Sequence, residues 1–225
     1  MATNGIPRPC AERSIGPHRQ GEPAMKTALR TALLSVLLCA PAAFAQDAAP
    51  AEPGMSPEVQ AMMAAWEKAM TPGEQHARLA EHFEGTWDTK MSLWMEPGAE
   101  PMVSTGNTTN TMILGGRQLK MEYSGVFMEM PFRGIGFTGY DNVRGVYTGS
   151  WTDNMSTGTM NSTGTYDAAT ATYTFKSEMP DPMHGGALVP IQETVKIVDA
   201  DHHVMEMFET RDGADVLTMI LEHSR

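Results

Sequence analysis

The stretch Gly85-Thr86-Trp87-Asp88-Thr89-Lys90-Met91-Ser92-Leu93 alternates between two kinds of side chain. Successive side chains of a β-strand point to opposite faces, so Trp87 and Met91 would share one face while Asp88 would lie on the other. An alternation of this kind predicts a strand with one buried and one solvated face. We therefore expect a β-rich body to start here.

The same period of two residues continues to the C-terminus. Later segments rich in β-branched and aromatic residues also have it: 117–124, 147–151, 173–175, 195–198, 204–208 and 216–221. Turn-forming residues such as Gly115-Gly116, Asp141-Asn142 and Asp212-Gly213 separate them, so consecutive strands would pair as hairpins. About nine or ten strands without intervening helices predict an all-β, up-and-down antiparallel β-barrel, because closure removes exposed strand edges. A two-sheet sandwich is the alternative.

Upstream of this body, the hydrophobic period is close to four. Ser56-Pro57 is typical of a helix start, and apolar residues then recur at helical spacing as far as Met70. Thr71-Pro72-Gly73-Glu74 has the form of a capping box with proline at the first helical position, which would open a second helix. We therefore expect short N-terminal helices over 56–84 and the β-barrel domain over 85–225.

Residues 25–45 have the three parts of a secretory signal peptide: a basic start, an apolar run, and the cleavage sequence Ala43-Phe44-Ala45. The apolar run is too short for a stable membrane anchor. We interpret 1–24 as an extension upstream of the true start at Met25, and 46–55 as a flexible leader. The sequence thus predicts an exported protein, periplasmic or secreted, with no stable membrane anchor after cleavage.

The chain is acidic and methionine-rich, with a formal net charge of -11 and 20 methionines in 225 residues. Removal of 1–45 would take away five basic and two acidic residues and both cysteines, which changes the net charge to -14. Phosphate-binding surfaces need an excess of Lys and Arg, so we expect no nucleic-acid partner. A mature chain without cysteine would exclude disulfides and thiol catalysis. The oligomeric state leaves no trace in the sequence.

A set of short motifs runs along the chain in this order: Thr71-Pro72-Gly73-Glu74-Gln75-His76, Gly85-Thr86-Trp87, Pro97-Gly98, Leu114-Gly115-Gly116-Arg117, Gly139-Tyr140-Asp141-Asn142, Trp151-Thr152-Asp153, Asp181-Pro182-Met183 and the terminal Arg225. Together they resemble the bacterial family known as domain of unknown function 1579. That resemblance implies a lipocalin-like (calycin) β-barrel and names no activity. The sequence departs from the family around Asp215-Val216 and His223, where lysine and tyrosine are usual.

Gly85-Thr86-Trp87 also looks like the motif that opens the first strand of lipocalins, whose tryptophan lies beneath an arginine of the last strand. Arg225 stands at the matching place near the C-terminus. We expect Gly85, Trp87 and Arg225 to be structural, with a cation–π contact that closes the barrel floor.

Tyr147 and Trp151 would share one strand face, and an inward face would give a pocket with apolar walls and a few polar anchors. The candidate lining residues are Arg117, Tyr123, Tyr147, Trp151, Asp153 and His184. The alternative is a solid core, because small barrels often fill their interiors. We therefore expect an exported, non-enzymatic barrel without a cofactor that binds a small apolar or amphipathic ligand.

A hydrolase or isomerase is the first alternative. His184 lies in a loop and would act as a general base with Asp141 or Asp153. No nucleophile elbow or metal-binding motif accompanies it, so we assign no catalytic residue and no metal ligand. His202 and His203 follow an acidic turn and are expected to be exposed.

A periplasmic copper carrier is the second alternative. Met128-Glu129-Met130 and Met205-Glu206-Met207 have the M-x-M form of soft sites for Cu(I). The same spacing puts both thioethers on one strand face, which also describes a core filled by a flexible apolar residue. We favour the core.

Overall fold

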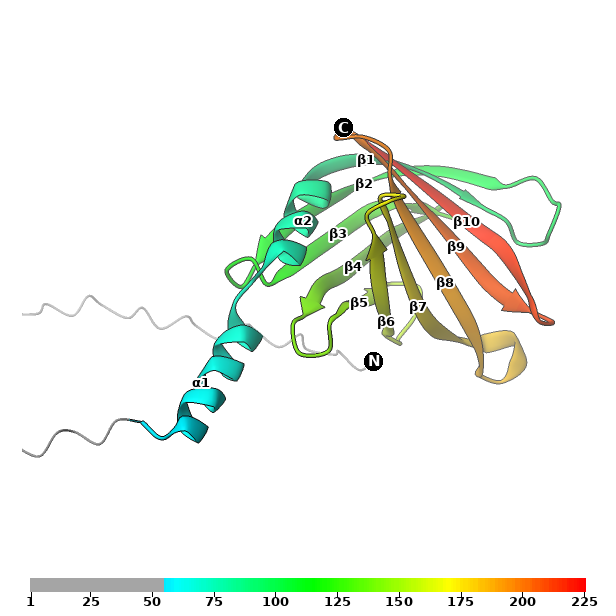
Figure 1. The fold of residues 1–225 in the computed structure, drawn as a ribbon. Helices are drawn as coiled ribbons and strands as arrows, with labels where there is room; N and C mark the ends of the chain where they lie inside the picture. The colour runs from blue at the N-terminus through cyan, green and yellow to red at the C-terminus, as the bar shows by residue number, and fades with distance from the viewer. Residues whose placement is uncertain (1–54) are drawn as a thin grey trace, which may run out of the picture. The chain divides into compact units, whose positions relative to one another are not determined.

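The computed structural model describes residues 55–225, in which ten antiparallel strands form one closed barrel. Each strand pairs with its neighbours in sequence, and β1 pairs with β10 to close the ring (Figure 1). This confirms the up-and-down barrel and excludes the sandwich. The expected upstream extension, signal peptide and nearly all of the leader lie outside the described residues.

The strands follow one another with short connections (Figure 1). Their bounds are β1 Gly85–Leu93, β2 Met102–Ile113, β3 Gln118–Phe127, β4 Met130–Asp141, β5 Val146–Asp153, β6 Met160–Asp167, β7 Thr172–Asp181, β8 Ala187–Ile197, β9 His202–Arg211 and β10 Ala214–Ser224. A single turn of 3-10 helix, η1 Pro182–His184, interrupts the connection between β7 and β8.

Two helices precede the barrel. In α1, Pro57–Met70, the Ser56 side chain caps the first turn as expected, yet none of the helix residues is buried. α2 spans Glu74–Phe83 and begins later than the predicted capping box, with Gly73 at its N-cap. There, Nδ1 of His76 accepts a hydrogen bond from the Gly73 backbone at 3.1 Å. The Thr71 hydroxyl instead donates to the carbonyl of Glu67, because it ends α1 rather than starting α2. Within residues 55–225, neither helix has the length and apolar character needed to cross a membrane.

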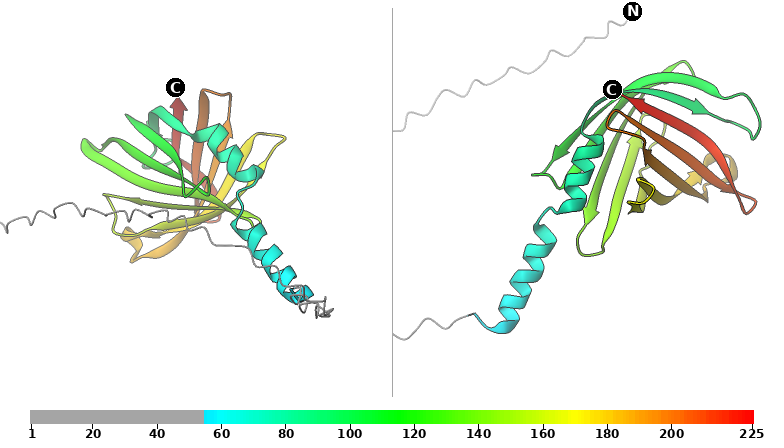
Figure 2. Two further views of the ribbon diagram at one scale, coloured as in Figure 1. Left: turned by 90° about the vertical axis from the view of Figure 1, so that its left-hand side faces the viewer. Right: turned by 45° about the horizontal axis from the view of Figure 1, so that its top comes forward.

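α2 covers one end of the barrel, here called the closed end (Figure 2). The amide of Asn110 donates to the carbonyl of Phe83 at 2.9 Å, which ties the end of α2 to the end of β2. Leu79 of α2 is fully buried in the main core cluster with Tyr147, Tyr173 and Phe175. Burying a leucine side chain of this kind contributes about 2 kcal/mol.

The strand connections alternate between the two ends. Those between β2 and β3, β4 and β5, β6 and β7, and β8 and β9 lie at the closed end, with both α2 and the C-terminus. The other five connections lie at the opposite end, which no described element covers; we call it the open end. The space that the strands enclose is called the lumen below.

Candidate functional site

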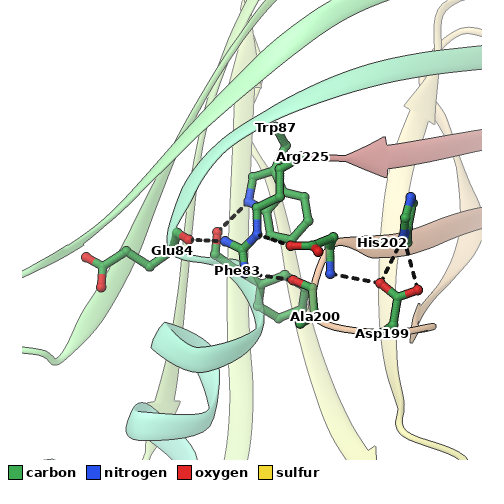
Figure 3. A network of polar contacts seen from close by, with 8 residues as sticks. Phe83, Glu84, Trp87, Asp199, Ala200, His202 and Arg225 are labelled. Atoms are coloured by element: carbon green, nitrogen blue, oxygen red, sulfur yellow. Dashed lines mark hydrogen bonds and ion pairs between the residues drawn. The ribbon is translucent and has the colours of Figure 1, made fainter.

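The floor of the lumen is sealed by a network around Trp87 and Arg225 (Figure 3). The Arg225 guanidinium carbon lies 4.1 Å from the centroid of the Trp87 ring, in cation–π geometry. The same guanidinium donates to the carbonyls of Glu84 at 2.8 Å and Ala200 at 2.7 Å. The indole N–H of Trp87 donates to the carbonyl of Phe83 at 2.8 Å. One arginine therefore joins the C-terminus to the end of α2 and to the turn between β8 and β9.

Two buried histidines lie above this floor. The rings of His203 on β9 and His223 on β10 are stacked with centroids 4.1 Å apart, and the edge of His203 meets Trp87 at 4.4 Å. Burial lowers the pKa of His203 to about 2 and that of His223 to about 4. Both rings are therefore neutral at neutral pH. The expectation that His203 is exposed is wrong: it is 3% exposed, because the strand begins at His202 and turns the next side chain inward.

The same side of the lumen holds buried polar atoms without a partner among residues 55–225. They are Oγ1 of Thr89, Oγ of Ser104, Oγ1 of Thr108, Oδ1 of Asn110, OH of Tyr123 and Nδ1 of His203 and His223. All lie on β9, β10, β1, β2 and β3, which are consecutive in the barrel. A buried polar group left unpaired costs about 1–3 kcal/mol, so these atoms favour binding of water or of a polar ligand group.

Glycines on the inner wall hold aromatic rings against the barrel. The six-membered ring of Trp151 lies over Gly134 and Gly136 on β4. An added Cβ would collide with it at Gly134 and would lie tightly against it, at 3.2 Å, at Gly136. Tyr123 covers Gly106 and Gly125 in the same way, its OH lying 2.7 and 2.6 Å from the Cβ positions. These rings occupy space that other residues would fill with a side chain. They therefore lie along the wall and leave the lumen less filled.

The middle and open half of the lumen are lined by apolar side chains that remain half-buried although they point inward. They include Leu93, Met121, Phe132, Trp151, Met160, Met205, Met207 and Met219. Their partial exposure shows that neighbouring side chains do not cover them completely. Methionine and aromatic surfaces of this kind adapt to apolar ligands of irregular shape.

Glu193 differs from the inward carboxyl groups Asp153 and Glu209, which are paired with Trp151 and Arg211. Glu193 on β8 pairs in register with Phe175 on β7 and Met207 on β9, both of which point inward. Burial raises the pKa of Glu193, and no side chain among residues 55–225 forms a hydrogen bond or ion pair with it. Glu193 is thus an unpaired acid among apolar neighbours.

The open end is edged by exposed methionines. They are Met95, Met102, Met128, Met130, Met155, Met179 and Met183, from four of the five connections at that end and the adjoining strand ends. The expectation that Met128 and Met130 fill the core is wrong, because Met128 and Glu129 form the tip of the hairpin between β3 and β4 with φ of 49° and 64°. The other M-x-M pair, Met205 and Met207, does point into the lumen.

The predicted lining residues divide into two groups. Tyr123, Tyr147 and Trp151 point inward, and the Trp151 N–H donates to Asp153 at 2.8 Å. Tyr147 belongs to the packed core beneath α2, and its hydroxyl accepts from Arg78 at 3.4 Å. Arg117 does not line the lumen, because it lies in the turn between β2 and β3 and donates to the carbonyl of Met70 at 2.6 Å.

His184 lies outside the lumen, in the connection between β7 and β8. Its Nδ1 contacts Oδ2 of Asp181 at 2.6 Å, an exposed pair that lowers the pKa of Asp181. The proposed partner Asp141 is the last residue of β4, at the closed end, whereas η1 lies at the open end. Asp153 bonds to Trp151 and to the backbone of Met155 and Ser156. The structure therefore does not bring His184 together with either aspartate.

No group of three or more His, Cys, Asp or Glu side chains within residues 55–225 is arranged to hold a metal ion. The residues that the sequence interpretation missed are Glu193, His203 and His223. Strand alternation could have placed Glu193 on the inward face, because residues two apart on a strand share a face and its neighbours at that spacing are Ile191 and Val195.

Two solved structures are among those similar to this chain. The M. tuberculosis protein Rv2717c is 14% identical with a TM-score of 0.50, and the match covers 69% of this chain and 99% of that one. A redesigned β-barrel, b11L5F_LGL, is 13% identical with a TM-score of 0.35 and coverages of 66% and 95%. A search of curated protein sequences finds no match. The family model "Protein of unknown function (DUF1579)" matches residues 71–225, more than half of the chain, and the protein therefore belongs to the DUF1579 family.

Proposed function

We propose that this protein binds a small amphipathic ligand in the lumen and reaches it through the open end. The observation that carries the proposal is the set of inward-facing but half-buried apolar side chains, among them Met121, Met160 and Met207. Unpaired polar atoms on β9, β10, β1, β2 and β3, such as Oγ of Ser104, support a ligand that also has a polar part. Apolar walls with a few polar groups are typical of small-molecule sites.

The exposed methionines around the open end support access from that side. A flexible thioether side chain covers apolar surface without fixing its shape, which suits a mouth that must admit ligands. Ligands would not enter through the closed end, because α2 and the Trp87–Arg225 contact obstruct it.

The proposal can be tested by a substitution that places a large side chain inside the lumen. Met121→Trp adds a large ring at an inward position of β3, whereas Ile135→Trp adds the same ring at an outward, 41% exposed position of β4. We expect decanol and related amphiphiles to raise the melting temperature of the wild type and of Ile135→Trp. Binding to Met121→Trp should weaken at least tenfold.

Circular dichroism would verify that both variants keep the β-rich fold, and Met205→Phe would provide a second filled lumen if Met121→Trp fails to fold. The proposal is overturned if no amphiphile binds the wild type, or if the inward and outward variants bind equally well.

Export belongs to the same proposal and rests on the sequence of residues 25–45. Expression of the full chain in a bacterial host, followed by mass spectrometry of the periplasmic fraction, should give a mature N-terminus at Gln46. An intact chain confined to the cytoplasm would contradict export without affecting the binding proposal.

A further inference from the structure

We infer that the lumen selects amphiphiles with a cationic head group, such as an amine or a quaternary ammonium, and that the carboxylate of Glu193 is their counter-ion. This inference rests on the proposed binding function and names the chemical class of its ligand. It depends on the position of Glu193 and on the distribution of charge over the inner and outer faces of the barrel.

Glu193 occupies an inward position at which an apolar residue would be expected. Its register partners are Phe175 and Met207, and the inward residues before and after it on β8 are Ile191 and Val195. A carboxyl group surrounded by apolar side chains is costly unless it is paired or neutralised. Burial accordingly raises the pKa of Glu193. A bound cation would supply the missing partner.

Basic side chains are nearly absent from the inner face. Among the strand residues of the described barrel, Arg211 at the open end of β9 is the single Lys or Arg at an inward position, and it is paired with Glu209 at 2.6 Å. His203 and His223 are neutral at neutral pH because burial lowers their pKa values. The described inner wall therefore has no unpaired basic side chain that would neutralise Glu193 or the head group of an anionic amphiphile.

The rest of the lining is also compatible with a cation. Trp151 lies against Gly134 of the wall and stays half-buried at an inward position, and aromatic faces attract cations. The whole chain has a formal net charge of -11, which raises the local concentration of cations around it. An anionic amphiphile would be repelled by Glu193, by the face of the aromatic ring and by the net negative charge of the chain.

The test compares three probes of one chain length and different head groups: decyltrimethylammonium, decanol and decanoate. Isothermal titration with the full chain should show decyltrimethylammonium binding at least tenfold more tightly than decanoate, with decanol between them. Glu193→Gln keeps the shape of the side chain and removes the charge. It should weaken decyltrimethylammonium binding at least fivefold and leave decanol within twofold.

Glu178→Gln is the matched control, because it removes the same charge from an exposed, outward position of β7. It should leave all three affinities unchanged within twofold. The inference is overturned if the wild type binds the three head groups equally well, or if Glu193→Gln binds decyltrimethylammonium as tightly as the wild type. In either case, binding of decanol would still support the proposed function. Failure of all three probes to bind overturns the proposed function itself. If Glu193→Gln does not fold, the head-group preference of the wild type still decides.

Discussion

The two ends of this barrel are built from different kinds of contact. At the closed end, Leu79 and Trp87 are almost completely buried, and named hydrogen bonds join α2 to the strands and the C-terminus. At the open end, Met128 and Met183 are 55% and 86% exposed. The difference indicates that contacts at the closed end contribute more to the stability of the fold than those at the open end.

The largest effect should come from removing the closed-end tryptophan. Trp87→Ala deletes a buried ring, its hydrogen bond to Phe83 and the surface beneath Arg225. We expect the free energy of unfolding to fall by about 3–5 kcal/mol, measured by urea denaturation. Leu188→Ala at the open end, where the side chain is 60% exposed, should cost less than about 0.5 kcal/mol. Similar losses from both variants would refute the contrast between the ends.

Acid should weaken the closed end specifically. His203 and His223 have pKa values lowered from 6.5 to about 2 and about 4, so the unfolded chain binds protons that the folded chain does not. Stability is therefore full above about pH 6.5 and falls as the pH decreases, by about 1.4 kcal/mol per pH unit for each histidine. Glu193 acts in the opposite direction because its pKa is raised, so the comparison with a histidine variant is essential.

The appropriate variant is His223→Gln, with the exposed His202→Gln as its control. Urea denaturation between pH 4.5 and 6.5 should show a flatter pH dependence for His223→Gln, by close to one bound proton, and no change for His202→Gln. A pH dependence that both variants share with the wild type would mean that the buried histidines do not titrate as described.

A smaller loss is expected from the arginine of the floor. Arg225→Lys keeps a cation above Trp87 but cannot hold the planar pair of bonds to Glu84 and Ala200. We expect a loss of about 1–2 kcal/mol, visible as a lower melting temperature. Arg133→Lys, on an exposed outward position of β4, is the control and should have no effect. An unchanged melting temperature for Arg225→Lys would show that the floor does not depend on this geometry.

The smallest effect on stability should come from oxidation of the open-end methionines. Dilute hydrogen peroxide should oxidise Met128 and Met183 well before Met91, which is 6% exposed. The unfolding free energy should then change by less than about 0.5 kcal/mol, because these side chains already face water. Peptide mapping by mass spectrometry measures the order. Oxidation of Met91 at the same rate would show that the lumen is more open than its burial implies.

Much of the fold could be predicted from local patterns. The alternation from Trp87 to Leu93 and the turn residues at Asp141-Asn142 and Asp212-Gly213 predicted consecutive hairpins, and the structure has them. Hairpin geometry depends on a few neighbouring residues, which explains this success. The start of α2 was placed too early, because Thr71 caps the end of one helix as well as it would cap the start of the next.

The candidate site was harder to predict. Apolar residues look alike in a sequence whether they fill a core, line a lumen or edge its open end. Met91 is buried, Met207 points into the lumen and Met183 is exposed at the open end. Arg117 shares its strand pattern with Tyr123, yet it belongs to a turn at the closed end. His203 follows an acidic turn, which predicts an exposed side chain, but it lies one position after the exposed His202 on β9 and therefore points inward.

The sequence by itself therefore determined the order of the strands, their inward and outward faces and the acidic charge of the chain, because these depend on composition and on a period of two residues. Only the tertiary structure decided which inward side chains meet. It stacked His203 on His223, laid Trp151 against Gly134 and left Glu193 without a partner. Those contacts arise from closure of the barrel and from the register between strands, which bring together residues far apart in the chain.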